Sequence, residues 1–378
     1  MNRKDFIYQT AVGLAALSVG VSCTKQKGKS IPQFGPQSAE AKMGDIRALL
    51  LHLGSNMWCD YPTEMMGAPA PESAKTLDVK PEFSLVWPDE MWRKVTDRAA
   101  AAGVNMIVID LGEGVFYPSH PELAVEGTWS VEKMQTEIKR LNSLGIEVVP
   151  KLNFSTTHNG WMGDYSHMVS SKPYYRMCEE VISDVVEIFG HPRFFHIGFD
   201  EERSSFQEGQ DFQYICTRKG EYWWQDFLHI VREVEKHGSR PWMWCDFGWN
   251  SDEFYERCPK SVIQQNWFYD ECHGGFDPET NTTSDAKILK AFKKLDDAGF
   301  DQVPCGTNWI GWGRRELGLD ADDVIGKLVK FGRENISKEH LLGFMMGTWE
   351  IYAWPNMTRE EHFQKIFEGI DLFEEAMK

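Results

Sequence analysis

Eight short apolar segments, separated by segments with helical spacing, constrain the fold more than any other feature of this chain. Apolar residues recur at helical spacing in the intervals, and several intervals end at Gly, as helices often do; examples are 88–103, 130–145 and 226–238. Continuous apolar runs that alternate with amphipathic helices indicate buried parallel strands. Eight such units predict a (β/α)8 TIM barrel formed by residues 46–378. The expected strands lie within 48–58, 105–115, 146–154, 193–202, 240–249, 261–270, 301–312 and 341–350.

A doubly wound open sheet is the alternative α/β fold. It would usually carry a Gly-rich phosphate-binding turn after its first strand, and LGSNMW at 53–58 is not such a turn. A length of 378 residues is long for one domain, but α/β barrels of comparable size fold as a single unit. The sequence therefore favours one barrel domain.

The first 45 residues have a different character. Residues 1–23 resemble an export signal, because basic residues precede an apolar, small-residue stretch that ends at Cys23. NRKDFI is similar to a twin-arginine export motif with Lys in place of the second Arg, and VGVSC resembles a bacterial lipoprotein cleavage site; a plain signal peptide is the alternative. Residues 24–45 have no apolar period and read as a flexible tether. We expect export to the periplasm or the bacterial envelope, with membrane contact only through a lipid on Cys23.

Charge and cysteine content exclude several classes of partner. The chain has 40 basic and 57 acidic residues, and a net charge of −17 disfavours nucleic acid and anionic membrane surfaces. Seven Cys remain after Cys23 without closely spaced pairs, so neither a zinc site nor a disulfide framework is indicated; Cys59, Cys245 and Cys305 are expected in the core. Only His52 and His196 lie within predicted strands, which disfavours a metal-dependent hydrolase. No cofactor is expected.

Carboxylates, amides and large aromatic residues follow nearly every predicted strand. In a parallel barrel the functional residues collect at the C-terminal strand ends. Helix capping explains one or two of the carboxylates but none of the Trp residues, although core packing explains any single Trp equally well. Acids with indoles suit carbohydrate, because sugar faces stack on aromatic rings while acids bind hydroxyls. The candidate substrate-binding residues are Asp110, Asn153, His158, His196, Trp249, Trp267, Tyr269, Asp270, Asn308, Trp309, Trp349 and Glu350.

The segment HIGFDE at 196–201 carries a family resemblance. It resembles the His-x-Gly-Gly-Asp-Glu motif of family 20 glycoside hydrolases, the β-N-acetylhexosaminidases, which lies at the end of the fourth barrel strand. IEVVPKLNFSTTH at 146–158 is similar to the third-strand segment of that family and places His158 on its loop His. VIQQNWFYD and GTWEIYAW resemble its sixth and eighth strand ends. The chain differs in having Phe199 for the second Gly, no Arg on the first strand where the family holds sugar hydroxyls, and no small α/β domain before the barrel.

The resemblance implies a substrate-assisted retaining mechanism, in which the 2-acetamido oxygen of the substrate attacks the anomeric carbon. Asp200 would orient and polarise the acetamido group, and Glu201 would act as general acid/base. Tyr269 or Asn308 would contact the acetamido group. His196 is expected inside the barrel as a hydrogen-bonded support for the acids, and His158 either binds a hydroxyl, supports the acid or is structural. Glu202 is expected outside the reaction, in an ion pair with Arg203.

Two other functions fit the same residues. A retaining glycosidase with an enzyme nucleophile needs a second carboxyl about 5 to 5.5 Å from Glu201, and Glu350, Asp270 or Asp246 would supply it. A non-catalytic glycan-binding barrel would retain the aromatic residues without needing the acids.

Overall fold

The structure is a computed structural model that describes residues 45–58, 84–85, 87–209, 212, 214–270, 274–308, 324–349 and 359–378. The predicted export signal lies outside these ranges, as does the predicted tether except for Asp45.

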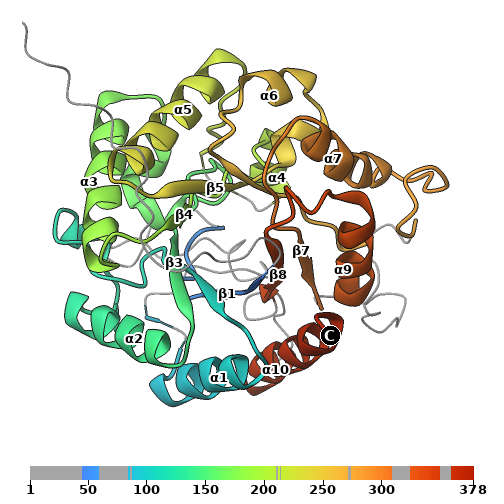
Figure 1. Cartoon of the computed structure of the whole chain (residues 1–378). Coiled ribbons are helices and arrows are strands. Elements are labelled where there is room, and N and C mark those ends of the chain that lie inside the picture. The colour runs from blue at the N-terminus through green and yellow to red at the C-terminus, as the bar shows by residue number, and fades with distance from the viewer. Residues whose placement is uncertain are drawn as a thin grey trace, which may run out of the picture. The chain divides into compact units, whose positions relative to one another are not determined.

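Eight parallel strands form one sheet, in the order β6-β5-β4-β3-β2-β1-β8-β7. Two isolated parallel bridges, Gln264 to Gln302 and Trp267 to Cys305, connect the edges at β6 and β7 and close the sheet into a barrel. The predicted (β/α)8 barrel is confirmed, with each strand inside its expected segment or beginning up to two residues before it (Figure 1). The strands are β1 (Ile46–His52), β2 (Met106–Asp110), β3 (Glu147–Lys151), β4 (Phe194–His196), β5 (Arg240–Trp244), β6 (Ile263–Gln265), β7 (Cys305–Thr307) and β8 (Gly343–Gly347).

Helices surround the barrel in the ring that Figure 1 shows. Ser130 and Ser171 accept hydrogen bonds from the third residue of α2 and α3 respectively, as N-cap residues do. The three helices expected from the sequence are present, and the third begins five residues early, at Glu221, because Trp223 and Trp224 extend its buried face. The α-helices are α1 (Asp89–Ala101), α2 (Val131–Ser143), α3 (Lys172–Ile188), α4 (Ser204–Gly209), α5 (Glu221–Lys236), α6 (Asp252–Arg257), α7 (Ala286–Asp297), α9 (Val324–Asn335) and α10 (Arg359–Ala376). The 3-10 helices are η3 (Pro121–Leu123), η4 (Gly160–His167) and η5 (Asp246–Trp249).

The last helix returns to the first. Helices α10 and α1 lie side by side in Figure 1, and Arg98 of α1 pairs with Asp371 at 2.5 Å and Glu374 at 2.8 Å. These ion pairs join the last helix of the ring to the first. No helix within the described ranges is long and apolar enough to cross a membrane.

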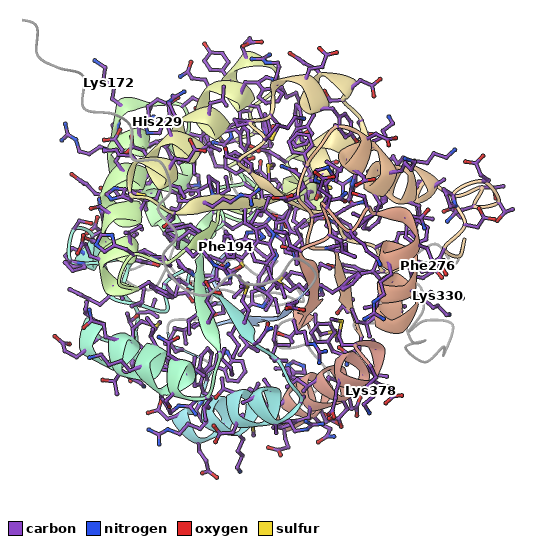
Figure 2. The ribbon with its side chains drawn as sticks, viewed as in Figure 1. Lys172, Phe194, His229, Phe276, Lys330 and Lys378 are labelled. Atoms are coloured by element: carbon purple, nitrogen blue, oxygen red, sulfur yellow. The ribbon has the colours of Figure 1, made fainter. Side chains whose placement is uncertain are left out.

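The buried apolar residues form two layers, as a barrel requires. A large cluster lies between the strands and the helices. A smaller cluster fills the barrel interior, with Phe194 near its middle in Figure 2. Cys245 and Cys305 are buried as expected, whereas Cys59 lies outside the described residues. The interior cluster comprises Ile46, Ala48, Leu50, Met106, Val108, Val149, Phe194, Trp242, Trp244, Ile263, Val303, Cys305 and Met345.

Candidate active site

A buried polar layer separates the apolar barrel interior from the mouth, the rim formed by the C-terminal strand ends. Side chains alternate along a strand, so the residue two positions after each interior residue also faces inward. Strand register places His52, Asp110, Lys151 and His196 beside one another across β1 to β4. With Gln265 of β6 they form the polar layer, and none is more than 1% exposed.

The sequence interpretation missed Gln265 and Lys151 of this layer, and Lys151 is the charged one. Its ammonium group forms an ion pair with Asp110, and the Oδ2 atom of Asp110 also lies 3.7 Å from His52 Nε2. Burial raises the pKa of Asp110, and the nearby Lys151 counteracts this shift. Asp110, predicted to bind substrate, thus lies below the mouth with its charge partner. A lysine inside the apolar run EVVPK was the available signal, because a buried lysine requires a partner.

His196 joins the polar layer to the β4 turn. The amide of Gly198 donates to its Nδ1 at 3.1 Å, which leaves Nε2 as the donor to Gln265 Oε1 at 2.7 Å. Burial and the charge of Lys151 lower the pKa of His196 well below its usual range. The ring is therefore a neutral, hydrogen-bonded support beneath the acids, the place expected from the sequence.

The chain then makes an unusual turn. Gly198 and Phe199 have φ of 73°, and Glu201 has φ of 54°. A Cβ at Gly198 would lie 2.0 Å from Asn153 Oδ1 and 2.8 Å from Asn153 Cα, so this position requires glycine. A left-handed Phe199 costs roughly 1–2 kcal/mol, and its buried ring offsets this by packing at 5.7 Å from Trp223 and 5.3 Å from Phe227.

Asp200 faces the β3 loop. Asn153 Nδ2 donates to its Oδ1 at 2.8 Å, and His158 Nδ1 lies 3.8 Å from the same oxygen. Ser155 and Thr157 donate to the Asp200 carbonyl at 2.5 and 3.2 Å. The Asn153 contact orients the carboxylate and the two hydroxyl contacts hold the main chain, while 15% of the side chain stays exposed. Asn153 and His158, two predicted binding residues, therefore position Asp200.

Glu201 is held from the opposite side. Its amide donates to Asp246 Oδ2 at 3.1 Å, and its carboxylate lies 3.5 Å from both His158 Nε2 and Arg203. The side chain is 23% exposed, so it can reach a ligand in the mouth. Burial lowers the pKa of His158, although Asp200 counteracts the shift. His158 thus lies between the two carboxyl groups and supports both.

Glu202 makes no hydrogen bond or ion pair with Asp200 or His158, but the prediction that it pairs with Arg203 was wrong. It pairs with Arg218 at 2.6 Å, whereas Arg203 pairs with Glu201. The buried Arg218 also binds Asp226 at 2.7 Å and the Phe154 carbonyl. This arginine therefore connects the β4 turn to α5 and to the β3 loop. Neighbours in the sequence do not decide which cation pairs with a buried acid.

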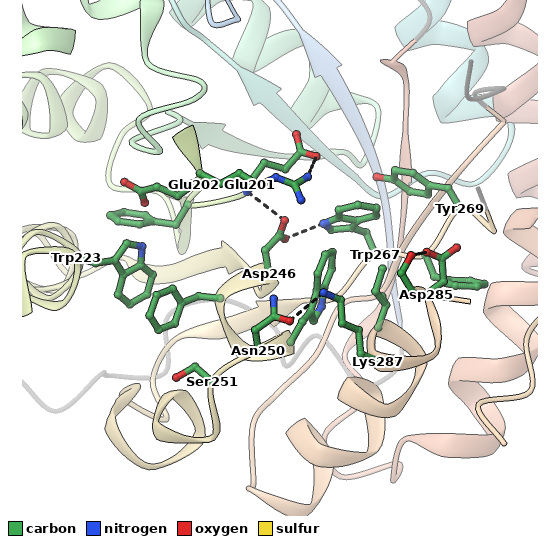
Figure 3. Close-up of a pocket in the computed structure, with 17 residues that line it drawn as sticks. Glu201, Glu202, Trp223, Asp246, Asn250, Ser251, Trp267, Tyr269, Asp285 and Lys287 are labelled. Carbon is green, nitrogen blue, oxygen red and sulfur yellow. Dashed lines mark hydrogen bonds and ion pairs between the residues drawn. The ribbon is translucent and has the colours of Figure 1, made fainter. Parts of the chain in front are cut away.

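Asp246 connects the acid to the aromatic wall. Its Oδ2 accepts the Glu201 amide and its Oδ1 accepts the Trp267 indole at 2.8 Å (Figure 3). Burial and the charge of Asp200 raise the pKa of Asp246 to about 7. The group therefore changes charge near neutral pH.

This raised pKa predicts a pH-dependent stability. A group whose pKa is raised on folding stabilises the fold below its unfolded pKa, and this contribution is lost as pH rises through the folded value. We expect unfolding free energy to fall by about 2 kcal/mol more in wild type than in Asp246→Asn between pH 5 and pH 8, measured by urea unfolding. Asp252→Asn, which removes an exposed nearby carboxylate, is the control. Equal pH dependence in wild type and Asp246→Asn would contradict the assignment.

The aromatic wall lies along β6, β5 and β8. Trp267 stacks on Tyr269 with ring centroids 4.9 Å apart and meets Trp249 edge-on at 4.7 Å. Trp349 donates to the Tyr269 hydroxyl at 3.0 Å and lies 5.0 Å from the His52 ring. Four of the predicted aromatic residues are thus brought together beside the acids.

Four other predicted substrate-binding residues are not found beside the acids within the described part of the chain. Asp270 accepts the Gly275 amide at 2.9 Å and is 7% exposed, so it closes its own loop. The Asn308 amide donates to the Lys365 carbonyl of α10 at 2.8 Å. Neither contact places these two side chains with the acids. Trp309 and Glu350 lie outside the described residues.

Two groups of described residues have the ligand atoms a metal ion would need. In one, His158, Asp200 and Glu201 each offer an atom within 4.8 Å of the others. The other comprises Glu179, His229 and Glu233, on α3 and α5. His158 Nδ1 is already 2.9 Å from the Thr157 hydroxyl, so only its Nε2 faces Glu201. The first group is therefore explained more simply by His158 supporting two carboxylates than by a metal site.

Comparisons by sequence find little, whereas comparison by structure finds a consistent group. No protein-family model matches the chain, and no curated protein matches it significantly. Among solved structures, β-N-acetylhexosaminidase from Bacteroides fragilis matches with a TM-score of 0.53 and 12% identity, covering 85% of this chain and 65% of that one. Dispersin B matches with a TM-score of 0.53 and 15% identity, covering 77% and 95%.

A third match is a mutant β-hexosaminidase from Streptomyces plicatus in complex with its product, GlcNAc. Its TM-score is 0.52 with 13% identity, covering 88% of this chain and 64% of that one. The chain spans about two thirds of the Bacteroides and Streptomyces proteins. At these identities the likeness concerns the fold: the described barrel is similar to the barrel of family 20 β-N-acetylhexosaminidases.

Proposed function

We propose that this protein is an exported glycoside hydrolase that removes N-acetylhexosamine residues from glycans by a substrate-assisted retaining mechanism. The observation that carries the proposal is the β4 turn. It presents Asp200 and Glu201 as adjacent carboxylates, fixed by different partners, with His158 at 3.8 Å from one and 3.5 Å from the other. Adjacent side chains held this way can serve two roles around one sugar.

Asp200 fits the role of orienting group. Asn153 fixes one of its carboxylate oxygens, so the carboxylate is preorganised to accept the N–H of a 2-acetamido group and stabilise the charge that develops as its oxygen attacks. Glu201 fits the role of general acid/base. It would protonate the glycosidic oxygen and then deprotonate the water that opens the cyclised intermediate. No enzyme carboxylate needs to bond to the sugar in this mechanism.

The aromatic wall supports a sugar as ligand. Trp267, Tyr269 and Trp349 present ring surfaces and one hydroxyl beside the acids. The Streptomyces hexosaminidase with a comparable barrel was solved with GlcNAc, which is consistent with an N-acetylated ligand here. The alternatives are a glycosidase with an enzyme nucleophile and a non-catalytic glycan-binding barrel.

A screen of aryl glycosides tests the proposal. Wild-type protein should release the aryl group from N-acetylglucosaminide or N-acetylgalactosaminide, and much more slowly from the corresponding glucoside and galactoside, which lack the internal nucleophile. Comparable rates on 2-hydroxy and 2-acetamido substrates would favour an enzyme nucleophile. Binding of a glycan without release of any aryl group would favour the non-catalytic barrel.

Export is part of the proposal and rests on the sequence of residues 1–23. The mature chain should be recovered outside the cytoplasm, in the periplasm or held at the envelope by a lipid on Cys23. Cell fractionation that found the full-length chain in the cytosol would contradict it.

A further inference from the structure

Arg218 is a buried cation beside the β4 turn. A cavity of about 570 Å³ opens beside Glu201, between the β4 turn, η5 and the start of α7 (Figure 3). Arg218 is not among the residues that line this cavity, and its side chain is only 2% exposed. We propose that Arg218 is a positioning residue for the hydrolysis, because it holds the two residues that flank the Asp200–Glu201 pair. This inference rests on the proposed function, since it assigns a role in that reaction.

Arg218 holds the turn that carries the acids at both of its ends. Before the acids, the guanidinium carbon of Arg218 lies 5.1 Å from the centroid of the Phe199 ring. After the acids, Arg218 Nε donates to Glu202 Oε1 at 2.6 Å, and the Glu202 side chain is only 4% exposed. Asp200 and Glu201 are therefore the two residues that lie between contacts with one buried cation.

A third contact of Arg218 reaches the loop that orients Asp200. The Nη2 atom of Arg218 donates to the Phe154 carbonyl, and the residue before it, Asn153, donates to Asp200 Oδ1 at 2.8 Å. A guanidinium group is planar and presents five donors in a rigid fork, so it can fix several partners relative to one another. Arg218 thus sets the β3 loop, which orients Asp200, against the turn that carries Glu201.

Arg218 is itself held in place from the ring of helices. Its Nη1 atom donates to Asp226 Oδ2 at 2.7 Å and to the Tyr174 hydroxyl at 3.1 Å. Asp226 of α5 is fully buried, and it also accepts the hydroxyls of Tyr175 at 2.5 Å and Ser170 at 2.9 Å. The cation that contacts the turn is therefore anchored to α3 and α5.

The backbone of the turn explains why it needs such an anchor. Phe199 and Glu201 are both in the left-handed region, with φ of 73° and 54°. Residues other than Gly, Asn and Asp rarely adopt this conformation, and they keep it only where the surrounding structure holds them. Without the contacts of Arg218 the turn could relax toward commoner backbone angles, which would move Glu201 relative to Asp200.

Glu202→Ala tests the proposal, because it removes the link to the end of the turn and leaves Arg218 paired with Asp226. The substrate is the phenyl glycoside of the N-acetylhexosamine that the aryl glycoside screen identifies, since phenol is a poor leaving group that needs protonation. We expect kcat to fall by about 10²-fold, the loss expected when reacting groups move by about 1 Å. KM should change much less, because the aromatic wall is left unchanged. Glu202→Gln should recover most of the lost kcat, since its amide oxygen still accepts from Arg218.

Arg218→Lys is the second variant, and it carries the test if Glu202→Ala does not fold. It keeps the buried positive charge, but an ammonium group cannot reproduce the planar fork that binds several partners. Its kcat should fall to a similar extent, again with a much smaller change in KM. Adding Glu202→Ala to Arg218→Lys should reduce kcat little further, because both changes break the same contact.

Arg240→Met is the matched control. Arg240 also joins a main-chain carbonyl to a carboxylate, through Ser261 at 2.5 Å and Asp301 at 2.7 Å. It is the first residue of β5, at the end of the barrel opposite the mouth. Arg240→Met should lower the melting temperature and leave kcat close to wild type, with every kcat measured at a temperature where circular dichroism shows the variant to be folded.

A kcat close to wild type in Glu202→Ala or Arg218→Lys would overturn the positioning role and leave the proposed function intact. A higher KM with unchanged kcat in Glu202→Ala would also overturn it, because Glu202 lines the cavity and would then be binding substrate. A Glu202→Gln variant as slow as Glu202→Ala would show that the hydrogen bond to Arg218 does not position the acids. Wild-type protein that hydrolyses no aryl glycoside would refute the proposed function and this role together.

Discussion

Glu201→Gln is expected to slow the hydrolysis of substrates with poor leaving groups by roughly 10²- to 10⁴-fold, the usual contribution of a general acid. Aryl glycosides with good leaving groups should lose much less, because they depart without protonation. Asp200→Asn should slow both kinds of substrate, since the acetamido oxygen attacks the anomeric carbon as the bond to either leaving group breaks. Steady-state kcat/KM for a disaccharide and for a nitrophenyl glycoside separates these outcomes.

Glu208→Gln is the control for this experiment. Glu208 is an exposed acid on α4, seven residues after Glu201, and it does not line the described cavity. Its replacement should leave both rates close to wild type. If Glu201→Gln slowed good and poor leaving groups equally, Glu201 would not be the general acid.

Lys151→Met is expected to lower the unfolding free energy by about 3–5 kcal/mol at neutral pH, because it leaves the buried Asp110 without its partner. Met fills much of the volume of the lysine stem, so the effect should come from charge rather than from a cavity. Equilibrium urea unfolding measures the change.

The double variant Lys151→Met/Asp110→Asn keeps this prediction testable if the single variant does not fold. Removing both charges should recover much of the stability, since the unpaired carboxylate is then gone. A double variant no more stable than Lys151→Met would show that the polar layer owes its stability to packing rather than to the ion pair.

Much of the fold could be predicted from the sequence, because parallel strands that are buried on both faces appear as continuous runs of apolar residues. All eight strands lie where that signal placed them, although β4, β6 and β7 contain only three residues each. Strand length was less accessible, since the apolar run continues into residues such as Ile197 and Phe199, which are buried without extending the strand.

The parts of the site that depend on residues close together in the sequence could be predicted from it. Asp200, Glu201 and the third-strand loop come together because consecutive parallel strands are neighbours, and His158 falls between the two acids. Contacts that depend on the direction in which a side chain points could not be predicted from the sequence. Asp270 and Asn308 follow strands as expected, yet hydrogen bonds to Gly275 and Lys365 direct their side chains elsewhere.

Ion pairs between residues far apart in the sequence also could not be predicted from it. Glu202 has Arg203 beside it in the chain but pairs with Arg218, because the left-handed turn at Phe199 and Glu201 decides where each side chain leaves the backbone. The motif resemblance placed a Gly at residue 199, and Phe199 keeps the left-handed backbone that such a Gly would favour. Chemistry at this turn thus depends on backbone conformation as much as on residue identity.

In the proposed mechanism the substrate, not the protein, supplies the nucleophile. The most direct test is the intact-protein mass spectrum of wild type, quenched during turnover of a 5-fluoro aryl N-acetylhexosaminide, which retains the acetamido group and slows breakdown of any intermediate. We expect release of the aryl group with the protein mass unchanged. A protein heavier by one fluorosugar, with the sugar bonded to Asp246, Asp270 or Glu350, would contradict it and establish the enzyme-nucleophile mechanism instead.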